Sequence, residues 1–316
     1  MIILGLIFLF LPCIFVGLRV WAKWLSRRSL QADDYLIFGG LAFSVACSIT
    51  QLIGSIHGLL SQHETVDSHG QPLLQDPKFL TYQRCKFSSQ MLGVLSLGLT
   101  KLSLLVLFRN IFAVSRAFNL ASAILIAITA AWTVSFFFSN LFTCYPITAL
   151  VEEYYNNNCL DSLAMWYAGC ITDVLIDLII MVLPLPMVFK LQLAPKQKVA
   201  VSAVFVMGTG VIAISITRLA MYVKIGSTYL DHYTDDSYYI SPIVFWTNIE
   251  TALAVILACL PTLRPLWTFY RGRHPAKSAS PSFEPYNSSS RRSGHKRIPE
   301  TYNELDTINL IRHPER

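Results

Sequence analysis

The sequence predicts an all-α, polytopic membrane protein with seven transmembrane helices, an exoplasmic N-terminus and a cytosolic C-terminus. Of the 316 residues, 53% are hydrophobic and only 14% are charged, whereas a soluble domain carries about a quarter charged residues. The apolar residues gather in blocks long enough to cross a bilayer, which takes about 20 residues. Such blocks without alternating polarity indicate helices rather than barrel strands, because a backbone in lipid must satisfy its own hydrogen bonds.

The predicted helices are residues 2–21, 35–57, 87–108, 120–142, 163–189, 199–223 and 242–267. The first block has no basic region before it and no small-residue cleavage pattern after it, so we expect a retained anchor rather than a signal peptide. In the second block, Gly40, Ser44 and Ser48 recur at every fourth residue. This spacing predicts a face that packs closely against another helix.

The basic residues of the short loops predict the orientation, because cytosolic loops carry more lysine and arginine than exoplasmic ones. One set of loops contains Lys23, Arg27, Arg28, Arg109, Arg116, Lys190, Lys196 and Lys198. The opposite set contains Lys78, Arg84, Lys86 and Lys224. The first set is therefore predicted to be cytosolic, which places the N-terminus outside the cytosol.

The chain divides into a predicted membrane domain, residues 1–270, and a basic, serine-rich cytosolic tail, residues 271–316. The tail contains KSASPSFEPYNSSSRRSGHKR, which has no apolar periodicity. A segment of this composition cannot bury enough apolar surface to fold, so we expect it to be disordered.

Three of the seven cysteines, Cys85, Cys144 and Cys159, fall on the predicted exoplasmic side, where disulfides persist. A bridge from Cys144 to Cys159 would close the loop CYPITALVEEYYNNNC, and a bridge from Cys85 to Cys159 would tie the third helix to that loop. We favour the first pairing, although sequence alone does not determine connectivity. No group of cysteines and histidines has zinc-site spacing, so no metal site is expected.

Five ionisable residues lie inside the apolar blocks: Lys101, Asp173, Asp177, Arg218 and Glu250. Each unpaired charge at the bilayer centre costs roughly 2.5 to 3.5 kcal/mol, so they must pair, become neutral or face water. The chain direction predicts an outer cluster of Asp173, Arg218 and Glu250 and a deeper contact from Lys101 to Asp177. Such a cluster could fix helix packing, line a ligand pocket or support catalysis.

Two adjacent aspartates, Asp33 and Asp34, precede the second block. A carboxylate at a helix start accepts hydrogen bonds from free backbone N–H groups and faces the positive end of the helix dipole. Arg19, Arg27 and Arg28 are close enough in sequence to hold the second carboxylate. A metal-binding pair is the weaker interpretation, because no third acidic or histidine ligand lies nearby in sequence.

Six stretches occur in order along the chain: LRVWAKWLSRRSLQADDYLIF, KLSLLVLFRNIF, FTCYPITALVEEYYNNNCLD, TDVLIDLIIMVLPLPMVFKLQL, GVIAISITRLAMY and FWTNIETALAVILACLPTLRPL. Together they resemble the fungal rhodopsin-domain integral membrane proteins, and the resemblance spans nearly all of residues 18–266. It implies a seven-helix, receptor-like protein of a kind often encoded beside secondary-metabolite genes. In this resemblance Arg19, Asp33 and Asp34 form a structural motif.

The leading interpretation is a receptor-like or accessory membrane protein, tied to secondary metabolism or to host or environment sensing. Its expected partners are membrane lipids, a small lipophilic ligand and a cytosolic signalling protein, and no nucleic acid is expected to bind. No cofactor is expected, because retinal proteins use a lysine of the seventh helix and PIVFWTNIETALAVILACLPTLRPLW has none.

An enzyme is the main alternative: a cyclase or isomerase of a lipophilic metabolite could use Asp173, Asp177 or Glu250 as proton donor. A transporter ranks last, because the sequence shows no internal repeat.

Overall fold

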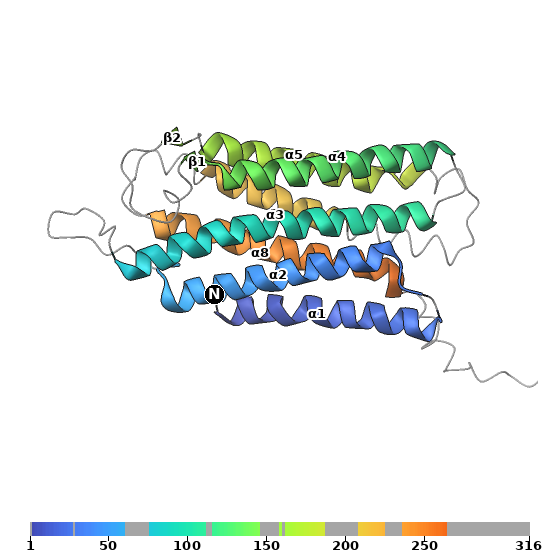
Figure 1. Cartoon of the computed structure of the whole chain (residues 1–316), viewed down its shortest axis with the longest axis horizontal. Helices are drawn as coiled ribbons and strands as arrows, with labels where there is room; N and C mark the ends of the chain where they lie inside the picture. Colours follow the sequence, from blue (N-terminus) through green and yellow to red (C-terminus); the bar gives the residue numbers. More distant parts are fainter. Residues whose placement is uncertain are drawn as a thin grey trace, which may run out of the picture. The chain divides into compact units, whose positions relative to one another are not determined.

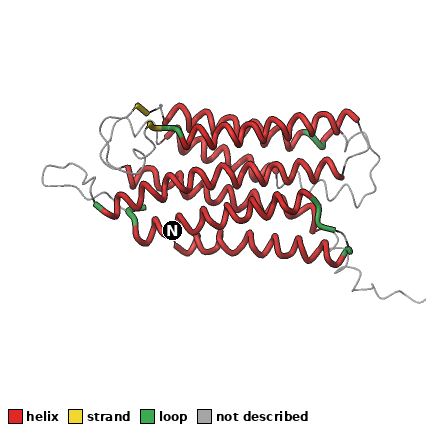
Figure 2. Tube along the Cα trace, in the orientation of Figure 1, coloured by secondary structure: helices red, strands yellow, loops and turns green. Residues whose placement is uncertain are grey.

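The computed structural model describes residues 2–27, 29–60, 76–111, 116–145, 158–159, 162–186, 208–224 and 236–263. All of these lie in one compact unit, Met1–His274. Its elements are α1 (Ile2–Leu25), α2 (Ala32–His57), α3 (Pro77–Ile111), α4 (Arg116–Leu141), β1 (Cys144–Tyr145), β2 (Asn158–Cys159), α5 (Ser162–Val182), α8 (Asp236–Cys259) and the 3-10 helix η2 (Leu260–Leu263). Residues 208–224 are also helical. The described part of the chain is therefore almost entirely helical (Figures 1 and 2).

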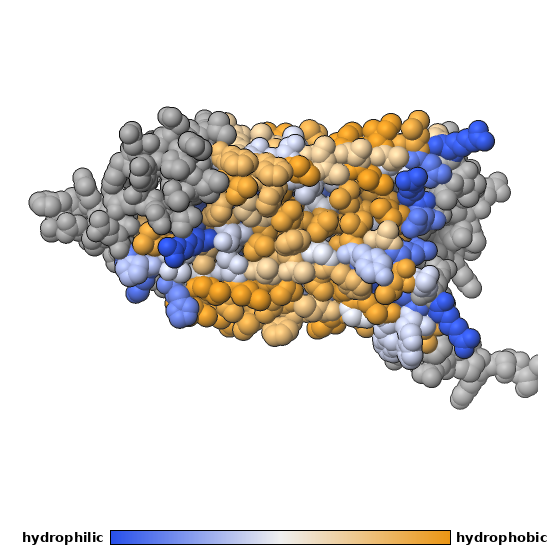
Figure 3. Space-filling model, in the orientation of Figure 1, coloured by the Kyte–Doolittle hydropathy of each residue, from blue (hydrophilic) through white to orange (hydrophobic). Residues whose placement is uncertain are grey.

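Six helical segments of the described chain are long and apolar enough to cross a membrane: α1, α2, α3, α4, α5 and the stretch Ser241–Leu263. Figure 3 shows apolar side chains along the helices and hydrophilic ones toward their two ends. The predicted sixth span coincides in part with the helical residues 208–224, and residues 199–207 lie outside the described residues. A seventh span therefore stays a prediction. The predicted tail, residues 271–316, lies outside the described residues as well.

The third helix is central to the bundle. It packs against α2, α4 and α8, while α1 packs against α2 and α8 (Figure 1). In membranes, helices associate through close packing and interhelical hydrogen bonds rather than through hydrophobic burial. The central position of α3 allows its polar side chains to contact neighbouring helices inside the bundle.

The small-residue face of α2 is a helix contact, as its spacing predicts. Gly40 lies so close to α3 that an added Cβ would be 2.6 Å from Oγ1 of Thr100. Ser96 donates a 2.9 Å hydrogen bond to the carbonyl of Gly40, and Ser48 donates a 2.8 Å hydrogen bond to Oδ1 of Asn248 in α8. The small side chains let three helices meet and exchange hydrogen bonds inside the bundle.

The helix bounds differ from prediction most at α3, which begins ten residues earlier than the apolar block. Asp76 precedes the helix and accepts a 3.0 Å hydrogen bond from the backbone N–H of Lys78, and Pro77 occupies the first helical position. An acidic cap followed by proline is a favoured helix start. The added turns carry the fully buried Tyr82, which packs with Leu59 and Leu60. Hydropathy missed these turns because they are mostly polar.

The ends of α1 and α5 also differ from the predicted blocks. α1 continues to Leu25, beyond the predicted end at residue 21, and carries Lys23 in its last turn. α5 ends at Val182, seven residues before the predicted end at residue 189, and Pro184 lies in the turn that follows. The last turn of α1 is charged, so it falls outside an apolar block although it is helical. The proline after α5 ends that helix, although the apolar block continues.

The two short strands pair in antiparallel register, with Cys144 opposite Cys159. Their backbones are thus aligned for the favoured disulfide, which stays a prediction. Cys85, the partner in the competing pairing, is a free thiol. It lies against α2, where an added Cβ on Gly54 would be 3.1 Å from the Cβ of Cys85.

Candidate functional site

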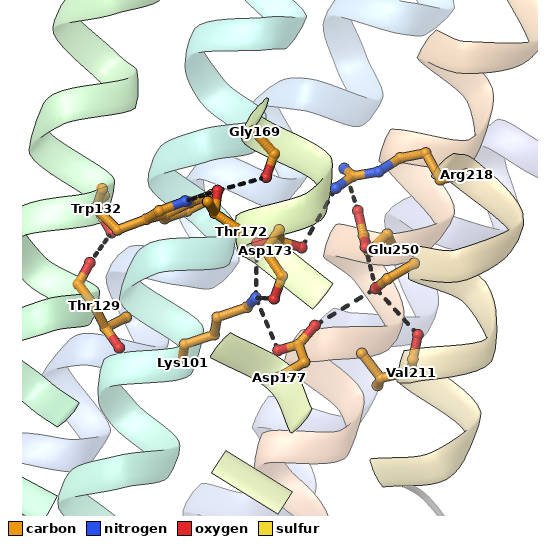
Figure 4. A network of polar contacts seen from close by, with 12 residues as sticks. Lys101, Thr129, Trp132, Gly169, Thr172, Asp173, Asp177, Val211, Arg218 and Glu250 are labelled. Carbon is orange, nitrogen blue, oxygen red and sulfur yellow. Dashed lines mark hydrogen bonds and ion pairs between the residues drawn. The ribbon is translucent and has the colours of Figure 1, made fainter. Parts of the chain in front are cut away.

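The five ionisable residues predicted inside the membrane lie together in one cluster, shown in Figure 4. Lys101 comes from α3, Asp173 and Asp177 from α5, Arg218 from the helical residues 208–224, and Glu250 from α8. The α5 spacing of four residues puts both aspartates on one helix face. Four of the five residues are at most 6% exposed, and the side chain of Asp177 is 11% exposed. We call this cluster the charge network.

At one end of the charge network, every donor of Lys101 has an acceptor. Its Nζ lies 2.7 Å from Oδ1 of Asp173, 2.8 Å from Oδ1 of Asp177 and 3.3 Å from the backbone carbonyl of Asp173. The ammonium group has three N–H donors, so these contacts use all of them. It also lies 5.6 Å from the ring centroid of Trp132 in α4, a favourable cation–π distance.

At the other end, Arg218 joins α8 to α5. Its Nη1 forms an ion pair with Oε2 of Glu250, and its Nη2 lies 3.3 Å from Oδ2 of Asp173. Asp173 therefore accepts from both cations of the charge network. Loss of the Asp173 carboxylate would therefore remove one charge-assisted contact from each cation.

Ser215 links the remaining two carboxyl groups. Its Oγ lies 2.5 Å from Oε1 of Glu250, 3.5 Å from Oδ2 of Asp177 and 3.2 Å from the carbonyl of Val211. The charge network is thus continuous from Lys101 through Asp177 and Ser215 to Glu250. These side chains are buried or nearly buried inside the helix bundle. An unpaired polar group there costs free energy, so the unbroken chain of contacts stabilises the network.

The contacts predicted from the sequence are present: Arg218 with Asp173 and Glu250, and Lys101 with Asp177. The prediction of two separate clusters is corrected, because the Lys101–Asp173 ion pair merges them. Sequence reasoning also missed Ser215 and Trp132. Ser215 lies three residues before Arg218 and so shares its helix face, a spacing from which the sequence could have predicted its role. No sequence pattern pointed to Trp132.

An apolar pocket of about 90 Å³ adjoins the charge network. Lys101 and Asp177 lie on its wall, and the other lining residues include Leu104, Phe108, Ile180, Met181, Val211 and Leu257. Ligand pockets are mostly apolar with a few polar groups that fix orientation. We call this cavity the Asp177 pocket.

A second pocket, of about 80 Å³, lies at the other end of the charge network. Arg218 lines it together with the aromatic side chains Trp132, Phe136, Trp166 and Tyr222. We call it the Arg218 pocket. Along α3 it touches Gln90 to Leu97, whereas the Asp177 pocket touches Leu97 to Phe108, so the charge network lies between the two.

A separate polar cluster forms where α1 ends and α2 begins. Nε of Arg19 is 3.0 Å from Oδ1 of Asp34 and its Nη2 is 2.5 Å from Oδ2 of Asp33, while Nη1 donates to the carbonyl of Ala258 in α8. Nζ of Lys23 contacts both aspartates, at 3.1 Å and 2.5 Å. We call this the Arg19 cluster; it ties three helices together.

The capping prediction is confirmed for Asp34, which accepts a 2.9 Å hydrogen bond from the backbone N–H of Gln31. The predicted basic partners are corrected in part. Arg19 holds both carboxylates, but the second cation is Lys23, which stands four residues later on the same helix face. Arg27 is exposed in the turn after α1, and Arg28 lies outside the described residues.

Comparison with known protein families matches residues 18–269 to the fungal rhodopsin domain. This chain belongs to that family. The family match covers the Arg19 cluster, the charge network and both pockets. Together with six apolar helices, it makes this fungal rhodopsin-domain protein a multi-pass membrane protein.

Several curated relatives are similar over most of this fungal rhodopsin-domain protein. Phomoidride biosynthesis cluster protein H of Fungal sp. (strain ATCC 74256) is 28% identical over 81% of the chain and 84% of its own length. Polyenoic acids biosynthesis gene cluster protein Ba17b of Metarhizium anisopliae is 23% identical over 81% of the chain and 70% of its own length. A SAT4 family membrane protein of Emericella nidulans is 27% identical over 66% of the chain and 53% of its own length.

Proposed function

We propose that this fungal membrane protein is a receptor-like or accessory component of secondary metabolism that recognises a small lipophilic molecule inside its helix bundle. The observation that carries the proposal is the Asp177 pocket, an apolar cavity whose wall includes two members of the charge network. An apolar molecule gains free energy on entering such a cavity, and the polar groups orient it. Relatives named for biosynthesis clusters support the link to secondary metabolism.

The charge network suits a receptor-like role because it connects two pockets. The Asp177 pocket contacts Lys101 and Asp177, and the Arg218 pocket contacts Arg218. A molecule bound in either pocket touches ion pairs that join α3, α5, α8 and residues 208–224. A change in these contacts would alter how four helices pack. In this way, ligand binding in one pocket could change the conformation of the whole bundle.

The proposed topology has seven transmembrane helices, an exoplasmic N-terminus and a cytosolic C-terminus. The basic loop residues support the orientation, and the helical residues 208–224 support a further span. The proposed role requires no retinal Schiff base, and α8 contains no lysine to form one. Membrane lipids surround the bundle, and a cytosolic signalling protein is the proposed downstream partner.

Ligand recognition is tested by filling the Asp177 pocket. The full chain is purified from its fungal host, and co-purifying lipophilic molecules are extracted and identified by mass spectrometry. In Leu104→Trp the larger side chain occupies the pocket, so we expect the bound molecule to decrease about tenfold or more. The matched control is Ile124→Trp, which makes the same kind of change at an exposed position of α4. Equal recovery from both variants, or no bound molecule in the unchanged chain, would contradict the proposal.

An acid–base enzyme is the second candidate, because Asp177 lies on the wall of an apolar pocket. In that case Asp177→Asn at normal membrane abundance would accumulate the same single precursor as deletion of the gene, since the proton donor is lost. A receptor-like protein would instead change the transcription of several genes without one accumulated precursor. Metabolite and transcript profiles of the two strains distinguish these outcomes.

A further inference from the structure

The two polar clusters differ in their balance of charge. The Arg19 cluster has two cations, Arg19 and Lys23, and two carboxylates, Asp33 and Asp34. The charge network has two cations, Lys101 and Arg218, and three carboxyl groups, those of Asp173, Asp177 and Glu250. Within the described ranges these five groups form ion pairs only with one another. With all five ionised, the charge network carries one surplus negative charge.

A surplus charge at this depth is costly. Four of the five groups lie on helices long and apolar enough to cross a membrane, and Asp173 and Glu250 are at most 1% exposed. A charge without a partner in such a place is removed by pairing or by taking up a proton. The charge network therefore requires one further positive charge, and a proton is the smallest that fits among groups already in contact.

The hydrogen bonds indicate where that proton lies. Ser215 has one hydroxyl hydrogen, and the 2.5 Å distance from its Oγ to Oε1 of Glu250 is the shortest of its three contacts. With the hydrogen donated to Glu250, a lone pair of Oγ is left facing Oδ2 of Asp177. Two acceptors face each other at this contact unless Oδ2 carries hydrogen. Oδ1 of Asp177 remains the acceptor for Lys101.

We propose that Asp177 is protonated in the resting protein and donates to Ser215, which donates to Glu250. The charge network then holds two cations and two carboxylates, as the Arg19 cluster does. The groups that face Asp177 are Lys101 of α3, Asp173 of its own helix, Ser215 and Arg218 of residues 208–224, and Glu250 of α8. The inference holds with or without a ligand in the pocket.

The side chain of Asp177 lies where a bound molecule could exchange this proton. Of the three carboxyl side chains in the charge network, that of Asp177 is the most exposed, at 11% against 1% for Asp173 and Glu250, and it alone lines the Asp177 pocket. A molecule in the pocket would meet a neutral carboxyl group that can donate or release its proton. Proton uptake and occupancy of the pocket would then be linked through one side chain.

Infrared spectroscopy tests the proposal directly. A protonated carboxyl group has a carbonyl stretching band that ionised carboxylates lack, and the band shifts in heavy water. We expect this band in the full chain in lipid nanodiscs at neutral pH, its loss in Asp177→Asn, and its retention in Asp34→Asn. A missing band in the unchanged chain, or a band that survives in Asp177→Asn, would overturn the proposal.

Stability provides a second measurement that needs no spectroscopic assignment. Asparagine has the shape and neutral charge of a protonated aspartate, so Asp177→Asn should leave the thermal unfolding midpoint within about 2 °C of the unchanged chain. The same change in the balanced Arg19 cluster, Asp34→Asn, removes an ionised acceptor of Arg19 and Lys23. It should lower the midpoint by about 5 °C or more. An equal loss in both variants, or failure of Asp177→Asn to fold, would contradict a protonated Asp177.

Discussion

At the scale of single residues, the guanidinium of Arg19 makes three contacts. It contacts two carboxylates of α2 and one carbonyl of α8 while being only 1% exposed. The planar group presents several donors in a fixed arrangement, which lysine does not. A single side chain of α1 thus fixes the position of two other helices.

Loss of Arg19 should therefore be far more damaging than loss of a neighbouring arginine. Arg19→Gln leaves Asp33 and Asp34 buried with only Lys23 as cation, and breaking a buried ion pair costs roughly 3 to 5 kcal/mol. We expect a much lower membrane abundance and a lower unfolding midpoint. Arg27→Gln, at an exposed position eight residues later, is the matched control and should change neither. If the two variants behave alike, the Arg19 cluster does not stabilise the bundle.

At the scale of elements, close approach between helices depends on glycine where two backbones meet. Gly98 of α3 lies against α4, and an added Cβ would be 2.1 Å from Oγ1 and 2.8 Å from Cβ of Thr133. Thr133 is itself held by a 2.8 Å hydrogen bond to the carbonyl of Thr129. The neighbouring side chain therefore cannot move aside without losing that bond.

The change Gly98→Ala should destabilise the protein by about 1 to 3 kcal/mol, because the added methyl group forces α3 and α4 apart. The matched control is Gly17→Ala in α1, where an added Cβ has no neighbour within 4 Å. There, alanine should stabilise the helix by roughly 0.5 to 1 kcal/mol. Thermal unfolding of both variants in the same detergent measures the difference, and equal effects would refute the packing argument.

On the scale of the whole molecule, the predicted exoplasmic side contains the paired strands β1 and β2. We predict a disulfide between Cys144 and Cys159, which requires an oxidising compartment. It can be examined in sealed vesicles of known orientation with a membrane-impermeant thiol reagent, using a Cys85→Ser background. Labelling from the exoplasmic side should appear only after reduction, because both thiols are consumed in the bond.

Two further variants complete that experiment. Cys144→Ser and Cys159→Ser each leave one unpaired thiol, so each should be labelled without reduction. Labelling of the unchanged loop before reduction would contradict the disulfide. Labelling from the cytosolic side would contradict the proposed topology, and the two outcomes are distinguishable.

The sequence predicted correctly the features that depend on neighbouring residues or on hydropathy averaged over a segment. The apolar blocks identified the spans to within a few residues for α2 and α4, because hydrophobic length must match the bilayer. The capping role of Asp34 followed from its place before an apolar run. The first ten residues of α3, most of them polar, lie outside the predicted span, because hydropathy does not record an Asp76 cap followed by Pro77.

By itself, the sequence determined the membrane class, the family and the list of buried charges, because lipid excludes charged residues unless they have partners. Only the tertiary structure decided which partners meet. Lys101 and Asp173 are 72 residues apart in the chain, and no periodicity within one helix encodes a contact between helices. The merging of the two expected clusters, the link through Ser215 and the surplus carboxyl group all arise where four helices converge. Where these helices meet, the five charged side chains form one network with a pocket at each end.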